Sequence, residues 1–129
     1  MIVAFASNQV MVAKGDGSGT GAPMVITTDP VPMNGMNRAS AILNVHSYLD
    51  AGAQVPRLTA QGQVSNDGVN WVNGGPAPTA TNAGLQQNAT ADAEGQFIRF
   101  QYTWAPEDGS NGSEYVFCCF DLHVRLDHT

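Results

Sequence analysis

The sequence predicts an all-β fold, an antiparallel β-sandwich of the jelly-roll kind that forms a single domain over residues 1–129. Three observations lead to this prediction. Apolar and polar residues alternate with period two in several segments, which is typical of half-buried strands. No segment repeats apolar residues at the spacing of a helix. The 14 glycines and 7 prolines gather between the alternating segments, where turns are expected.

Four segments carry the clearest alternation: residues 38–49, 57–64, 97–104 and 115–126. In the first, the odd positions are apolar apart from Ser47, and Ile42 and Tyr48 are apolar exceptions on the other face. In the last, one face is apolar throughout, whereas the other begins apolar and ends polar. Shorter strands are expected at residues 2–5, 9–13 and 24–28. An edge strand around residues 84–88 stays an open alternative.

Residues 14–23 are rich in glycine and are expected to form a flexible loop or arm. Lys14 precedes these glycines and no helix is predicted after them, whereas a phosphate-binding loop places its lysine after the glycines at the start of a helix. Other catalytic patterns, such as Gly-x-Ser-x-Gly and His-Glu-x-x-His, are absent from the sequence. We therefore expect no catalytic residues, no cofactor and no enzymatic activity.

The charge balance is acidic, with 11 Asp and Glu against 5 Lys and Arg. Proteins that bind nucleic acid cluster basic residues on one surface, but here these residues are spread one to a segment. No stretch approaches the roughly 20 apolar residues that span a bilayer. The first residues also lack the basic start of a signal peptide. We expect neither nucleic acid nor membrane as a partner, and synthesis in a reducing cytoplasm.

Cys118 and Cys119 are neighbours on a predicted strand, so their side chains point to opposite faces and cannot form a disulfide without severe distortion. Both are expected to be free thiols, with Cys118 in the core. Cys119, Asp121 and His123 then share the other face, and His46 could add a fourth metal ligand. Structural zinc sites usually contain paired Cys-x-x-Cys spacings, which this sequence lacks. A polar strand face is the favoured interpretation, and no metal is expected.

The strongest local signal is the stretch Gln-Val-Ser-Asn-Asp-Gly-Val-Asn-Trp at residues 63–71. Asn, Asp and Gly tolerate the positive φ of tight turns, so residues 66–68 predict a hairpin. Trp71 then either caps the core or lies exposed as a platform for a sugar ring. The structural role is favoured because large aromatic side chains are mostly buried.

Two predicted strands follow this hairpin along the chain. The first is Gly-Gln-Phe-Ile-Arg-Phe-Gln-Tyr at residues 95–102, and the second is the closing strand at residues 115–126. The layout resembles small β-sandwich virion proteins of tailed bacteriophages, which decorate or cement capsids or form parts of tails and fibres. The resemblance covers roughly the last two-thirds of the chain and rests on its strand and turn pattern. It implies a structural role in a virion, and it carries over no functional residues.

We therefore expect a non-enzymatic structural protein of a phage particle, above all a capsid decoration or cement protein. It would be made in the host cytoplasm and located in the virion. Its partners would be copies of itself in a homo-oligomer, and the major capsid protein or another virion protein. The candidate interface residues are aromatic side chains left over once one core is filled: Tyr48, Phe97, Tyr115 and Phe117. If their strands are neighbours, these side chains form one patch.

The alternative is a carbohydrate-binding, lectin-like module in which Trp71, and Trp104 or Tyr48, stack on sugar rings. An exposed coplanar pair of aromatic rings beside Asn, Asp or Gln would favour this alternative. Aromatic side chains buried in the sandwich would favour the structural protein.

Overall fold

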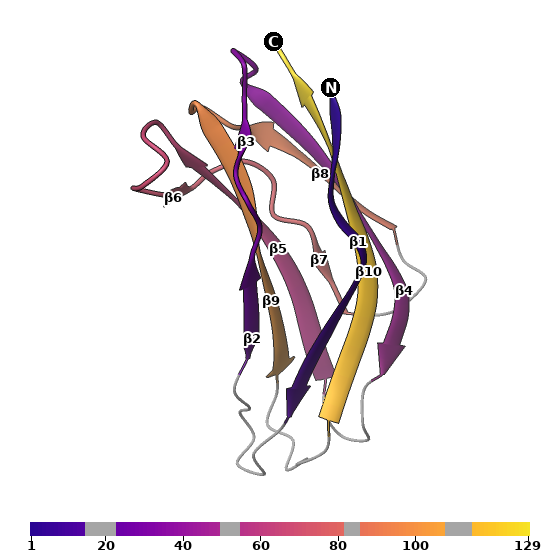
Figure 1. Ribbon diagram of the computed structural model, residues 1–129. Coiled ribbons are helices and arrows are strands. Elements are labelled where there is room, and N and C mark those ends of the chain that lie inside the picture. The colour runs from indigo at the N-terminus through magenta and orange to yellow at the C-terminus, as the bar shows by residue number, and fades with distance from the viewer. Residues whose placement is uncertain (15–22, 50–54, 82–85, 108–114) are drawn as a thin grey trace.

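The computed structural model describes residues 1–14, 23–49, 55–81, 86–107 and 115–129. Its strand pairs are antiparallel, and the strands form two sheets that face each other (Figure 1). The predicted antiparallel β-sandwich is confirmed. The glycine-rich loop expected at residues 14–23 lies, apart from its first and last residues, outside the described part of the chain.

Both sheets are built from strands that are distant in the sequence. Sheet A has the order β1 (Ile2–Lys14), β10 (Tyr115–Asp127), β4 (Arg38–Leu49) and β8 (Gln86–Asp92). Sheet B has β9 (Phe97–Glu107) and β5 (Val55–Ser65) at its centre. Two short strands flank β9 on one side, β2 (Met24–Thr27) and β3 (Val31–Pro32), and two flank β5 on the other, β6 (Val72–Asn73) and β7 (Thr79–Ala80).

The connectivity is that of a jelly roll. β2 and β3 act as one interrupted strand beside β9, and β6 and β7 act as another beside β5. Counted this way, the chain changes sheet at every connection except the one between β5 and β6. Two facing layers of four strand positions with this order define the double Greek key of jelly-roll domains. The sequence also left open an edge strand near residues 84–88, and β8 occupies that edge at Gln86–Asp92.

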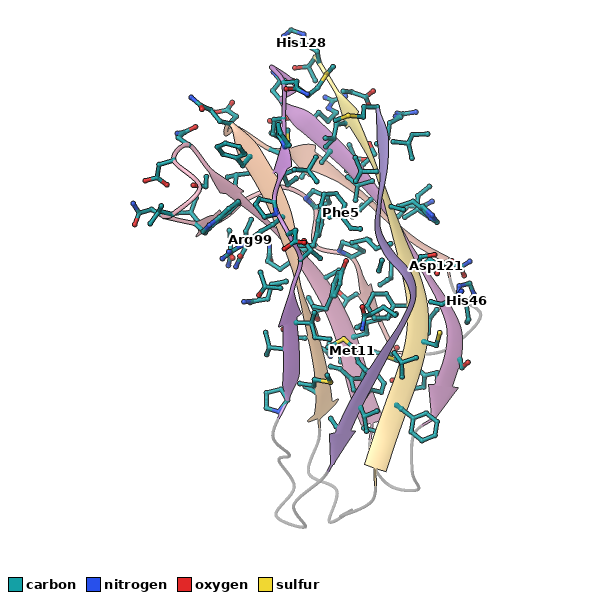
Figure 2. All side chains as sticks on the ribbon, in the orientation of Figure 1. Phe5, Met11, His46, Arg99, Asp121 and His128 are labelled. Carbon is teal, nitrogen blue, oxygen red and sulfur yellow. The ribbon has the colours of Figure 1, made fainter. Side chains whose placement is uncertain are left out.

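The core lies between the sheets and is filled by the alternating faces that the sequence predicts. The largest fully buried side chains are Trp104, Tyr102, Phe100, Phe120, Met11, Met33, Leu43, Leu58, Ile98, Leu122 and Leu126. The ring of Tyr102 meets that of Phe120 edge to face, with centroids 5.0 Å apart, so β9 and β10 are packed across the two layers. Figure 2 shows Phe5 and Met11 in the same interior space.

Tyr48 departs from the prediction, which placed it on the outer face of its strand. In the pairing of β4 with β10, Phe120 lies opposite Val45 and Cys119 lies opposite Ser47, so His46 is an extra residue in β4. Such a bulge shifts the alternation by one position. The Tyr48 ring therefore packs on the core, edge to face with Trp104 at a centroid distance of 5.1 Å. The predicted outward orientation of Tyr48 is wrong.

The two short strands expected at residues 2–5 and 9–13 form one strand, β1, which has an irregular register in its middle. The register of β1 against β10 shifts between Ala4 and Ala6 and again between Ala6 and Gln9. Asn8 in this stretch has a positive φ of 51°, which asparagine tolerates better than most residues. From Gln9 to Lys14 the pairing is regular.

Replacement of Gly62 by alanine should destabilise the sandwich. A Cβ atom at Gly62 would lie 2.6 Å from the Gly74 carbonyl oxygen and 3.1 Å from that of Pro76, both backbone atoms on the neighbouring segment. Overpacking of this kind costs about 1–3 kcal/mol. Urea unfolding of Gly62→Ala should show this loss, while Gln61→Ala, on the outer face of the same strand, should change the free energy of unfolding by less than about 0.5 kcal/mol. Equal stability of Gly62→Ala and the parent protein would contradict the described approach of these backbones.

Candidate functional site

Three large apolar side chains are exposed together on the outer face of sheet A. Val12 on β1 lies opposite Phe117 on β10, and Val10 lies opposite Cys119. Val10 is 53% exposed, and Val12 and Phe117 are each 42% exposed. Paired residues on adjacent strands project to the same face, so these side chains are contiguous. We call Val10, Val12 and Phe117, with the half-buried Cys119, the valine–phenylalanine patch. Contiguous exposed apolar groups usually mark an interaction surface.

The predicted patch of four aromatic side chains does not form. Phe97 lies on β9 in sheet B and Phe117 on β10 in sheet A, so they face outward from opposite layers. Tyr48 packs on the core instead. The backbone of Tyr115 pairs with Lys14, but its side chain lies outside the described part of the structure. Only Phe117 of the four candidates is thus placed in the valine–phenylalanine patch by the described side chains.

Sequence reasoning missed Val10 and Val12. The signal was present, because both sides of the stretch Val-Met-Val-Ala at residues 10–13 are apolar, as in the first half of the closing strand. Met11 and Ala13 fill the inner face and leave the two valines on the outer face. Apolar residues on both sides of this stretch are therefore the signal of an exposed apolar strand face.

A shallow hollow lies farther along the same face of sheet A, with a volume of about 570 Å³. Its lining residues are Ile2, Ser40, Ala41, Ile42, Asn88, Thr90, His123 and Arg125. The Arg125 side chain is bound to the Asp127 carboxylate at 2.8 Å, and the hydroxyl groups of Thr90 and Ser40 are 3.0 Å apart. The hollow therefore combines apolar and hydrogen-bonding groups that are already partly engaged with each other.

Between the hollow and the valine–phenylalanine patch, the Asp121 carboxylate on β10 contacts both neighbouring strands. One oxygen accepts a hydrogen bond from the backbone N–H of Asn8 at 2.6 Å, and the other lies 2.7 Å from Nε2 of His46. Figure 2 shows His46 and Asp121 side by side at this edge of the molecule. The Asn8 hydrogen bond, followed by the contact with His46, holds the pKa of Asp121 below its ordinary value.

Asp121→Ala should lower the free energy of unfolding by about 1 kcal/mol at neutral pH, because the Asn8 N–H loses a charged acceptor. A carboxyl group whose pKa is depressed by folding stabilises the protein above its unfolded pKa, and this stabilisation is lost as the pH falls through the folded pKa. The difference between the parent and Asp121→Ala should therefore be full above the ordinary pKa of an aspartate, about 3.9, and should shrink as the pH falls below it. Urea unfolding of both proteins at several pH values measures this difference in the free energy of unfolding.

Asp127→Ala is the matched control, because its carboxylate forms an exposed ion pair with Arg125, and its loss should change stability by less than about 0.5 kcal/mol. A difference between the parent and Asp121→Ala that grew as the pH fell would contradict the assignment.

The hairpin predicted at residues 66–68 is present and is organised by Asp67. One carboxylate oxygen of Asp67 accepts hydrogen bonds from the backbone N–H groups of Val69 and Asn70 and from the Ser65 hydroxyl. The other accepts one from the Asn70 side chain. These bonds, first those from the Asn70 and Val69 backbone, lower the pKa of Asp67 well below its ordinary range. The acidic residue of this turn is therefore used in shaping the loop.

The two tryptophans of the carbohydrate-binding alternative lie in different environments. Trp104 is fully buried, and its indole N–H donates to the Val116 carbonyl oxygen at 3.0 Å, so it offers no surface to a sugar. Trp71 is half-buried, and the Arg99 guanidinium lies over its ring, 4.2 Å from the centroid. Arg99 in turn donates to the Gln63 side chain, and Figure 2 shows it on the outer side of sheet B. The pair of exposed stacking rings is not formed by Trp71 and Trp104.

The possible metal ligands Asp121 on β10 and His46 on β4 contact each other. Asp121 is engaged by Asn8 and His46, and among the described residues no three His, Cys, Asp or Glu side chains gather as a metal site would require. The expectation that no metal is bound stays a prediction. No helix that could cross a membrane occurs in the described part of the chain.

The two cysteine thiols should differ sharply in reactivity. Both are free; Cys118 is buried and Cys119 is half-buried on the outer face, as the alternation predicts. Burial raises the pKa of the Cys118 thiol to about 12, so very little of the reactive thiolate forms near neutral pH. A thiol reagent at pH 8 should modify Cys119 in the native protein and leave Cys118 unmodified until denaturant is added. Mass spectrometry of the digested protein identifies the modified site, and rapid modification of Cys118 in the native state would contradict its burial.

Comparisons with known proteins add one finding about the fold. No known protein family matches the sequence, and no curated protein matches it. In its fold the chain is similar to one in the structure of infectious bursal disease virus, Gx strain, with a TM-score of 0.57 at 8% sequence identity. The match covers 96% of this chain and 30% of that one, so this chain spans about a third of the length of its structural neighbour. At this identity the likeness concerns the fold alone.

Proposed function

We propose that the chain is a non-enzymatic structural protein of a virus particle, and more specifically a capsid decoration or cement subunit of a tailed phage. The observation that carries the proposal is the fold of the sandwich, which over 96% of the chain is similar to part of a chain in a virus structure. Jelly rolls occur in viral capsid proteins and in lectins. The surface of this chain then favours one of these two classes.

The valine–phenylalanine patch supports a role in assembly. A protein that works alone gains nothing from three contiguous exposed apolar side chains, and such a patch promotes contact with other proteins. The net charge of −6 suits the outside of a particle better than an interior filled with nucleic acid. The partners in this proposal are copies of the chain itself and the major capsid protein or another virion protein, and the protein would be made in the host cytoplasm.

The carbohydrate-binding alternative has less support. Trp104 is inside the sandwich, and one face of the Trp71 ring is covered by Arg99. A sugar-stacking role for Trp71 would need the uncovered face alone or the displacement of Arg99. Binding to polysaccharide is therefore one of the outcomes that would count against the proposal.

Particles purified from a lysate of the producing host on a density gradient should contain the protein. After separation of heads from tails, the protein should be found with the heads, because a decoration subunit is bound to the capsid surface. Immunoblotting of the gradient fractions measures this distribution. Presence with tails alone would contradict the decoration role. Absence from particles, together with binding to polysaccharide, would contradict the virion role as well.

Phe117→Glu identifies the surface that binds. Heads from which the protein has been stripped should rebind the parent protein, and Phe117→Glu should rebind about tenfold or more weakly, because a charge is placed in an apolar contact. Val72→Glu changes an equally apolar side chain, 64% exposed, on the other sheet, and it should rebind like the parent. Equal rebinding of Phe117→Glu would exclude the valine–phenylalanine patch as the contact.

A further inference from the structure

Among the described strands, β1 is the terminal strand of sheet A, and its second half pairs with β10 on one side and with no strand on the other. The backbone N–H of Val12 points away from β10 and donates to the Met24 sulfur at 3.3 Å. Backbone groups point alternately to the two sides of a strand, so those of Val10 also face outward, whereas those of Met11 and Ala13 face β10. Figure 1 shows β1 at this margin of the sandwich.

The outward backbone groups have only weak or local partners in the described structure. A thioether sulfur is a poor hydrogen-bond acceptor. The carbonyl oxygen of Val10 accepts from the side-chain amide of the adjacent Gln9 at 3.1 Å. Both contacts can be exchanged for backbone hydrogen bonds to another strand at little cost.

From Gln9 to Ala13 this edge also lacks the features that usually prevent strands of different molecules from pairing. Natural edge strands are protected by lysine, proline or bulges. In β1 the irregular register lies before this stretch, between Ala4 and Gln9, and the one charged residue, Lys14, comes after it at the end of the strand. The opposite edge of the sheet, β8, consists of polar residues and alanine: Gln86, Gln87, Asn88, Ala89, Thr90, Ala91 and Asp92. The apolar, regular stretch is thus confined to one edge.

We propose that two copies of the chain pair through the second half of β1, antiparallel and about a twofold axis at Met11, so that sheet A continues from one copy into the other. Val10 then lies opposite the partner's Val12. The Val12 N–H donates to the carbonyl oxygen of the partner's Val10, and the Val10 N–H to that of the partner's Val12. The inference rests on the proposed function in treating the chain as a subunit that assembles.

The second half of β1 is complementary to itself, and for this reason we propose a second copy of the chain as its pairing partner. With the axis at Met11, valine meets valine on the outer face, and the Phe117 ring beside Val12 extends the apolar surface in each copy. An axis at Val12 would instead place Lys14 opposite Val10. A twofold contact also closes on itself, so it yields a dimer and leaves no free β1 edge for further growth. The outer faces stay uncovered, so the dimer presents two valine–phenylalanine patches side by side.

The test is sedimentation velocity of the purified full-length protein over a range of concentrations, with no particles present. The parent protein should sediment as a dimer that dissociates on dilution. Val12→Lys should raise the dissociation constant by about a hundredfold or more, because each lysine would lie in the apolar contact opposite the partner's Val10, with the partner's lysine diagonally across the axis. Val12→Pro should also give monomers, because it removes an N–H group that the pairing with β10 does not use. The Val12 side chain is exposed, so far-UV circular dichroism and the unfolding midpoint of Val12→Lys should match the parent.

The matched control is Asn88→Lys, which adds the same charge at an exposed position on the opposite edge of sheet A. It should sediment like the parent. A monomeric parent at the highest concentration, or equal dimerisation of Val12→Lys and Asn88→Lys, would overturn the proposed pairing. Neither result would bear on the virion role, which the fractionation of particles tests separately. A Val12-dependent dimer that is absent from particles would refute the virion role and keep the dimer.

Discussion

The structure depends on the row of aromatic side chains that β9 sends between the two sheets. Phe100, Tyr102 and Trp104 are buried, and the polar atoms of the last two reach the backbone of sheet A. The Tyr102 hydroxyl donates to the Phe5 carbonyl oxygen at 2.9 Å, and the Trp104 indole to that of Val116 at 3.0 Å. Buried polar groups are costly without partners, so these bonds fix where one layer sits on the other. Because these side chains fill the described interior, a binding surface is expected on the outer faces of the two sheets.

The two outer faces differ in character. On sheet B the central strands present mainly uncharged polar side chains, half-buried among one another: Thr59, Gln61, Gln63, Gln101 and Thr103. On sheet A the patch of Val10, Val12 and Phe117 stands beside polar groups farther along the strands. A subunit that attached through the outer face of sheet A would turn the outer face of sheet B toward solvent. This division fits a protein that adheres on one side and faces water on the other, as the proposed role requires.

The sequence was informative where the determining contacts are local. The period of two correctly assigned the buried face of β10, because it depends only on strand geometry. Tyr48 was misassigned because a bulge is set by the partner strand. The joint patch of Phe97 and Phe117 failed because the sheet that a strand joins is decided by the whole topology. Val12 was missed for the same reason: its exposure, and an N–H group that points away from β10 to the Met24 sulfur, follow from the place of β1 at an edge.

The Asp121 carboxylate joins the two irregular places of sheet A, the shifted register around Asn8 in β1 and the extra residue His46 in β4. Both flank β10 at the same level, and bulges bend and twist the strands that carry them. The regular pairing is therefore interrupted at this one level on both sides of β10. The hollow beside His123 and the patch around Phe117 lie on either side of this level, both on the outer face of sheet A. A partner bound to one of these two surfaces would leave the other accessible.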